Sequence, residues 1–205
     1  MDNNISFKSD IVFVNRSRFT MLTRRARSKY VDFDIKPIMT YANDFYSEAV
    51  RTCSGGGITD SKVKSGGYHI YDCFSTIDNL EQINNEIING FNPAETRGLV
   101  IGGKNLEGRL HSVGITEGII DFLKNKISAL TYFCEHLQVG EESDFHYNLL
   151  RDTWSICTTC FDNKIGFSFV NKLEDLPLFF RHAHLAEGDR LFMGTEDVTS
   201  QFKEF

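Results

Sequence analysis

The chain has 205 residues, of which 41% are hydrophobic and 24% charged, and its formal net charge is −6. This composition is ordinary for a soluble globular protein and excludes a disordered, collagen-like or fibrous chain. No stretch approaches 18 consecutive apolar residues, so we expect no membrane-spanning helix, and an odd count of five cysteines does not indicate a disulfide scaffold.

Positive charge is concentrated near the N-terminus. Residues 1–40 hold eight of the 22 Lys and Arg residues but only four acidic residues, whereas the remainder is acidic. This asymmetry predicts a basic, loosely packed N-terminal extension over residues 1–40 that can reach an acidic partner. The acidic body argues against a dedicated DNA-binding protein, because phosphate contacts dominate such binding. The polar first residues lack an apolar segment, so we expect no Sec-type signal peptide.

The first elements along the chain are short. The apolar run 11–14 predicts a strand, residues 15–30 predict a partly helical segment, and the alternation over residues 30–35 predicts a second strand. A run of three glycines follows at residues 55–57. Because glycine permits positive φ and weakens regular elements, we expect this run to lie outside any helix or strand interior.

Strands and helices alternate through the middle of the chain. Strands are predicted at residues 58–63, 68–74, 97–103 and 129–137, helices at 78–89 and 112–127, and a hairpin at 154–161 and 164–170. This order predicts an α/β or α+β fold with a mixed, largely antiparallel sheet or sandwich and two helices packed on one face. We expect one core over residues 41–170, with a C-terminal extension, 171–205, packed on it.

A cysteine and a histidine flank the glycine-rich region. Cys53 directly precedes Ser54 and the three glycines, and His69 follows sixteen residues later, after a second glycine pair. If the flanking segments are adjacent antiparallel strands, this separation can bring the imidazole beside the thiol and activate it as a nucleophile. The glycines would leave room for a substrate and free backbone N–H groups for an oxyanion. Cysteine and histidine are also common in buried cores, so the spacing alone leaves both interpretations open.

The layout of residues 40–170 resembles the bacterial glutamine deamidases related to the chemoreceptor deamidase CheD and the cytotoxic necrotizing factor toxins. In that group the nucleophilic cysteine closes one strand, and a histidine after a Gly-Gly pair follows on the next, as in residues 66–69 here. The predicted helix at 78–89 and the strand ending in Gly-Gly at 98–103 fit the same order. Ser47 stands close to the position of the hydroxyl residue that CheD carries a few residues before its cysteine.

The resemblance implies a cysteine-dependent deamidase with no cofactor. Cys53 would attack a side-chain carboxamide, His69 would act as acid and base, and backbone N–H groups, that of Cys53 included, would hold the oxyanion. Ser47 or a backbone carbonyl would orient His69, while Asp72 and Asp121 remain alternatives for the third residue. The implied substrate is a glutamine on a partner protein. The implied setting is the bacterial cytoplasm or, for a virulence effector or toxin, a host cell.

A second hypothesis is a non-catalytic interaction protein, stabilised by zinc. Cys157 and Cys160 form a CxxC pair, and His182 and His184 follow, which together make a Cys₂His₂ set. The His-x-His spacing is tighter than is usual for zinc. A redox function for the CxxC pair is not favoured, because its flanks look like a strand and not like the start of a helix.

Overall fold

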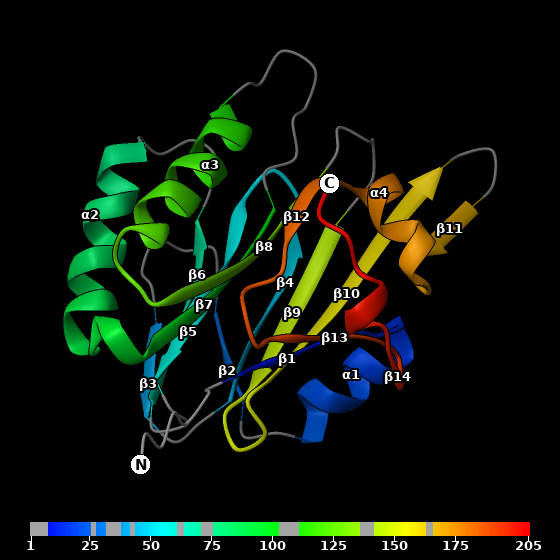
Figure 1. Cartoon of the computed structure of the whole chain (residues 1–205), viewed down its shortest axis with the longest axis horizontal. Coiled ribbons are helices and arrows are strands. Elements are labelled where there is room, and N and C mark those ends of the chain that lie inside the picture. Colours follow the sequence, from blue (N-terminus) through cyan, green and yellow to red (C-terminus); the bar gives the residue numbers. More distant parts are fainter. Residues whose placement is uncertain are drawn as a thin grey trace.

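The computed structural model describes residues 8–25, 28–31, 38–41, 44–60, 64–70, 76–102, 111–135, 142–162 and 166–205. Within these residues the chain forms two mixed β-sheets that face each other, with helices on their outer sides (Figure 1). Most strand pairs are antiparallel, and two helices cover one sheet face. The predicted α+β fold class is therefore confirmed, and no helix in the described part of the chain combines the length and apolarity needed to cross a membrane.

The eight-stranded sheet gathers segments from the whole chain. Its strands are β1 (Asp10–Phe13), β2 (Lys29–Tyr30), β4 (Phe45–Val50), β9 (Glu142–Asn148), β10 (Thr153–Asp162), β11 (Gly166–Phe169), β13 (Arg190–Met193) and β14 (Glu196–Asp197). The strand order is β14-β13-β1-β10-β9-β4-β2, and β11 pairs with β10 as the predicted hairpin. β1 runs parallel to both β10 and β13.

The six-stranded sheet holds the glycine-rich region. Its strands are β3 (Ile38–Tyr41), β5 (Ser54–Asp60), β6 (Lys64–Ile70), β7 (Thr96–Gly102), β8 (Ala129–Glu135) and β12 (Phe180–His184), in the order β12-β8-β7-β5-β6-β3. β7 and β8 are parallel, as expected of strands joined through the helix α3 (His111–Lys124). α2 (Thr76–Glu86) lies beside α3, and two further helices are α1 (Arg16–Arg25) and the short α4 (Leu176–Phe179).

Among the described residues, three apolar clusters hold these layers together. The largest lies between the two sheets and is rich in aromatic rings: Trp154 packs 4.6 Å from Tyr147 and 5.6 Å from Phe45, measured between ring centroids. A second cluster joins the six-stranded sheet to α2 and α3. A small third cluster, which includes Phe19 and Cys157, seats α1 on the outer face of the eight-stranded sheet. The layers therefore run α2/α3, six-stranded sheet, eight-stranded sheet, α1 (Figure 1).

The prediction that the glycine run interrupts regular structure is wrong. Gly55, Gly56 and Gly57 lie inside β5 and pair with both neighbouring strands. A Cβ added at Gly55 would lie 2.6 Å from the Phe145 ring of the opposite sheet, and one at Gly57 would lie 2.3 Å from a backbone oxygen. Glycine is thus required by close approach, and the space is filled by other side chains and backbone atoms of the protein instead of being left for a substrate.

The expectation of a loosely packed basic arm over residues 1–40 is also corrected for its described part. β1 lies inside the eight-stranded sheet, between β10 and β13, and α1 packs against that sheet through Phe19. The C-terminal segment adds β12 to one sheet and β13 to the other. A buried strand flanked by two partners forms part of the folded body, so the charge asymmetry does not mark a separate arm.

Candidate active site

The three predicted catalytic residues come from neighbouring segments. Ser47 lies on β4 of the eight-stranded sheet, and Cys53 lies where the chain crosses to the six-stranded sheet and directly precedes β5. His69 lies on β6, which pairs with β5. All three side chains are buried: Ser47 is 0%, His69 4% and Cys53 5% exposed.

Cys53 and His69 share one face of the six-stranded sheet. Gly55 pairs with His69, and alternate residues of a strand share a face, so Cys53, Gly55 and His69 all face the opposite sheet. The apolar cluster between the sheets includes Cys53, in agreement with this orientation. The pairing of Ser54 with Ile70 places Cys53 one step further along, diagonally across from His69. Such diagonal neighbours lie roughly 7–8 Å apart at Cα, within reach of long side chains.

A hydrogen bond across the gap between the sheets joins Ser47 to His69. The Ser47 hydroxyl donates its single proton to the carbonyl oxygen of Val31, at 2.6 Å. Its contact of 2.7 Å with Nδ1 of His69 must therefore use the hydroxyl oxygen as acceptor, so Nδ1 carries the proton. In the neutral ring the lone pair then resides on Nε2, the nitrogen that a general base would use.

A β-bulge turns the chain from Ser47 toward Cys53. The register of β4 against β9 shifts between Ser47 and Val50, and Ala49 adopts a positive φ of 57°. The Ala49 N–H donates to Oδ1 of Asp144 at 2.9 Å, and Arg16 forms an ion pair with the same carboxylate. Burial raises the pKa of Asp144 to about 6, opposed by the Ala49 hydrogen bond and by Arg16. Bulges commonly redirect a strand beside a functional site.

The carboxyl ends of three strands meet beside Cys53. β6, β7 and β8 end at Ile70, Gly102 and Glu135, at the end of the sheet where β5 begins. Gly102 has φ +122°, and a Cβ there would lie 2.4 Å from the carbonyl oxygen of Cys53, so only glycine fits. Gly102 thus lets the end of β7 pass close to the candidate nucleophile.

Glu135, at the end of β8, is a buried acidic residue that sequence reasoning did not single out. It is 1% exposed, and its carboxylate accepts a hydrogen bond from Ser143, whose oxygen also contacts the Thr158 hydroxyl at 2.8 Å. The available signal was an acidic residue at the end of an otherwise apolar strand. Its neighbour Cys134 faces the helices instead, and burial raises the pKa of that thiol to about 12.

The remaining predicted residues lie elsewhere. Cys157 and Cys160 point to opposite faces of β10, one toward α1 and the other between the sheets. His182 and His184 lie on the other sheet, beside Tyr132. The proposed zinc ligands therefore do not converge, and the described ranges contain no group of three or more His, Cys, Asp or Glu arranged to hold a metal ion.

The structure gives no support to Asp72 or Asp121 as the third catalytic residue. Asp121 is exposed on α3, on the side of the six-stranded sheet that faces away from Ser47, and Asp72 lies outside the described residues.

Compared with known protein families and with curated proteins, the sequence matches none of them. The argument for function therefore rests on the residues of this chain.

Proposed function

We propose that this protein is a cysteine-dependent deamidase that converts a glutamine side chain of a partner protein to glutamate. The observation that supports this most is the contact of His69 Nδ1 with Ser47, which leaves Nε2 as the basic nitrogen on the sheet face that Cys53 shares. In this proposal the Cys53 thiol is the nucleophile, the His69 ring is the base, and the Ser47 hydroxyl orients the ring. We include in this proposal the resemblance to CheD and the necrotizing factor toxins. A role as an effector follows from that resemblance and is part of the same proposal.

The reaction would proceed by acyl transfer. Nε2 of His69 takes the proton of the Cys53 thiol, and the thiolate attacks the carboxamide carbon to give a tetrahedral oxyanion held by backbone N–H groups. His69 returns the proton to the leaving nitrogen, so ammonia departs and a thioester remains. A water molecule, deprotonated by His69, then attacks the thioester, releases glutamate and regenerates the thiol. Ser47 would keep the ring in one tautomer throughout.

Alkylation by iodoacetamide, mapped peptide by peptide, tests for an activated thiol at Cys53. An ordinary thiol with a pKa of about 8.5 loses roughly fiftyfold in alkylation rate between pH 8.5 and pH 6.5, because its thiolate fraction falls. We expect Cys53 to keep most of its rate over this interval. Cys134 and Cys157 provide internal references, since burial raises the pKa of each thiol to about 12 and neither should react.

Three variants separate activation from simple exposure. His69→Ala and Ser47→Ala should both restore the ordinary pH dependence of Cys53 alkylation. Ser128→Ala is the matched control, because Ser128 also donates to a backbone carbonyl, that of Thr96 at 2.6 Å, but at the opposite end of β7. It should leave the labelling profile unchanged. An inert Cys53, or one whose profile is the same in His69→Ala, would contradict the deamidase and leave a non-catalytic protein.

If Cys53 is activated, the reaction itself can be sought. Proteins incubated with the wild-type chain are screened by mass spectrometry for Gln-to-Glu conversion, with Cys53→Ser as the inactive control. Conversion that depends on Cys53 identifies the partner and the glutamine.

A further inference from the structure

A cavity of about 670 Å³ opens on the outer face of the eight-stranded sheet, the face turned away from Cys53 and His69. Ligand sites are typically concave spaces of about 300–1,000 Å³ with mostly apolar walls and a few polar groups. None of the predicted catalytic residues lines this space, here called the outer cavity. A ligand bound in the outer cavity would therefore lie apart from the proposed deamidation site.

The floor of the outer cavity consists of two neighbouring rows of outward side chains. The register of β9, β10, β1 and β13 aligns one row as His146, Ser155, Val12 and Phe192. Two residues along, the same strands align Asn148, Thr153 and Asp10, which also line the cavity, with Arg190, which lies outside the lining. The first row thus changes from polar at β9 to apolar at β13. Such a floor suits a molecule with one polar and one apolar end.

The walls add apolar surface and positive charge. α1 contributes Met21 and Leu22 beside Arg18, and the turn between β9 and β10 contributes Leu150 and Arg151. Leu150 is 85% exposed, which is high for a leucine. Together the walls offer two guanidinium groups next to apolar side chains.

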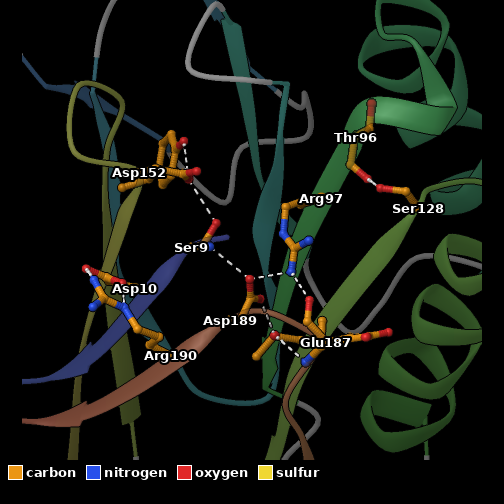
Figure 2. Close-up of polar contacts among 12 residues, drawn as sticks. Ser9, Asp10, Thr96, Arg97, Ser128, Asp152, Glu187, Asp189 and Arg190 are labelled. Atoms are coloured by element: carbon orange, nitrogen blue, oxygen red, sulfur yellow. Dashed lines mark hydrogen bonds and ion pairs between the residues drawn. The ribbon is translucent and has the colours of Figure 1, made fainter. Parts of the chain in front are cut away.

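The acidic groups around the cavity are already engaged. Asp10 forms a two-point ion pair with Arg190, at 2.8 and 2.7 Å (Figure 2). Asp44 accepts hydrogen bonds at 3.0 Å from the Asn148 side chain and from the backbone of Leu149. Arg18 and Arg151, by contrast, form no ion pair with any residue in the described part of the chain. Positive charge is therefore left for a ligand in a protein whose net charge is negative.

His146 supplies the second, independent observation. Its side chain is 1% exposed and lines the cavity, yet Nδ1 has no hydrogen-bond partner among the described residues. Nε2 lies 3.1 Å from the Ser28 hydroxyl and 3.7 Å from Oδ2 of Asp44, which favours a proton on Nε2. Burial lowers the pKa of His146, so the ring is neutral near pH 7 and Nδ1 is an acceptor. Buried polar atoms are normally satisfied, so His146 adds an unpartnered polar ring to the β9 end of the cavity.

We propose that the outer cavity binds a small organic anion that also carries an apolar group. The acidic group lies beside Arg18 and Arg151, and the apolar group covers Val12 and Phe192. A charge-assisted contact to arginine is stronger than a neutral one, so the anion supplies much of the affinity.

Fluorescence titration with 8-anilinonaphthalene-1-sulfonate tests this on the full chain. The probe carries a sulfonate, two aromatic groups and an N–H, and its emission rises in an apolar site. We expect saturable binding to one site, with at least a tenfold higher Kd for the double variant Arg18→Gln/Arg151→Gln. Both arginines are exposed, so the variant should fold, which circular dichroism checks. Lys172→Gln/Lys203→Gln is the matched control, because it removes the same charge from exposed positions elsewhere.

Competition defines the ligand chemistry. Decanoate should displace the probe, whereas decanol, which lacks the negative charge, should not. Cys53→Ser should bind the probe like wild type, so failure of the proposed deamidase and failure of this proposal are distinguishable. No saturable binding, equal affinity in the arginine and lysine double variants, or equal displacement by decanol would each overturn the proposal.

Discussion

The hydroxyl of Ser47 sets the protonation pattern of the candidate site. It has one proton, which the Val31 carbonyl accepts, so the hydroxyl oxygen faces Nδ1 of His69 as an acceptor. In a buried site such a hydrogen bond is stronger than in water, and the ring is held in one tautomer and orientation. A single serine on one sheet thus defines which nitrogen of a histidine on the other sheet is basic.

Asp144 makes stability depend on pH. Burial raises its pKa in the folded protein from 3.8 to about 6, so the folded chain holds a proton that the unfolded chain has released. The stabilisation from this group is complete below about pH 4 and is lost as pH rises to 6, with a slope of up to about 1.4 kcal/mol per pH unit. Asp144→Asn should remove that slope.

The measurement is the free energy of unfolding in urea at pH 4, 5, 6 and 7 for wild type and Asp144→Asn. Other carboxyl groups titrate in both proteins, so the difference between the two curves isolates Asp144. Parallel curves would show that the carboxyl is not perturbed by burial.

At the scale of elements, β5 depends on glycine because of what lies opposite. The ring of Phe145 and the side chain of Val50 occupy the space that a side chain at Gly55 would need. A Cβ added at Gly67 on β6 would likewise lie 2.6 Å from the ring of Phe45. The two sheets therefore approach closely at the strand pair that carries His69, and large aromatic residues on one sheet are matched by glycines on the other.

Gly55→Ala and Gly114→Ala should change stability in opposite directions. Adding a Cβ at Gly55 places it 2.6 Å from Phe145, and overpacking of this kind costs about 1–3 kcal/mol. Gly114 lies in α3 with nothing within 4 Å of an added Cβ, and alanine in a helix is better than glycine by about 0.5–1 kcal/mol. Urea unfolding of both variants checks this, and a gain in stability for Gly55→Ala would refute the packing argument.

For the whole molecule, a buried polar network ties the segments before β1 and before β13 to both sheets. Oδ1 of Asp189 accepts from the Ser9 backbone and forms an ion pair with Arg97 of β7, while Oδ2 accepts from Thr131 of β8 (Figure 2). The Ser9 hydroxyl donates at 2.9 Å to Asp152, in the turn between β9 and β10 of the eight-stranded sheet. The segment before β1 and the loop before β13 are thus joined to the central strands.

Asp189→Ala should lower the free energy of unfolding by about 3–5 kcal/mol, because it leaves the Arg97 guanidinium buried without its counter-charge. Glu187→Ala is the matched control in the same loop. Its side chain is exposed and only its backbone oxygen contacts Arg97, so a change within about 0.5 kcal/mol is expected. Chemical denaturation measures both. Equal losses would mean that the loop, and not the ion pair, carries the stability.

Local patterns predicted many of the elements. The strands near residues 11–14 and 97–103 and the helices at 78–89 and 112–127 were predicted because their periodicity is present in neighbouring residues. β9 and β13 were not predicted. The inward row of β9 begins with the polar Ser143, so its alternation is confined to residues 145–148, and β13 has only four residues. The functional roles of Cys53, His69 and Ser47 stay predictions, derived from spacing and resemblance.

The sequence by itself determined the class of fold and the residue types available for chemistry, because periodicity and composition are local properties. It did not determine that three glycines belong inside a strand, since the reasons lie in distant segments: for Gly55 the reason is Phe145, ninety residues away in the sequence. Likewise, the bond between Ser47 and His69 and the separation of Cys157 from Cys160 depend on how two sheets face each other. Contacts between distant segments are decided by packing, and only the tertiary structure contains them.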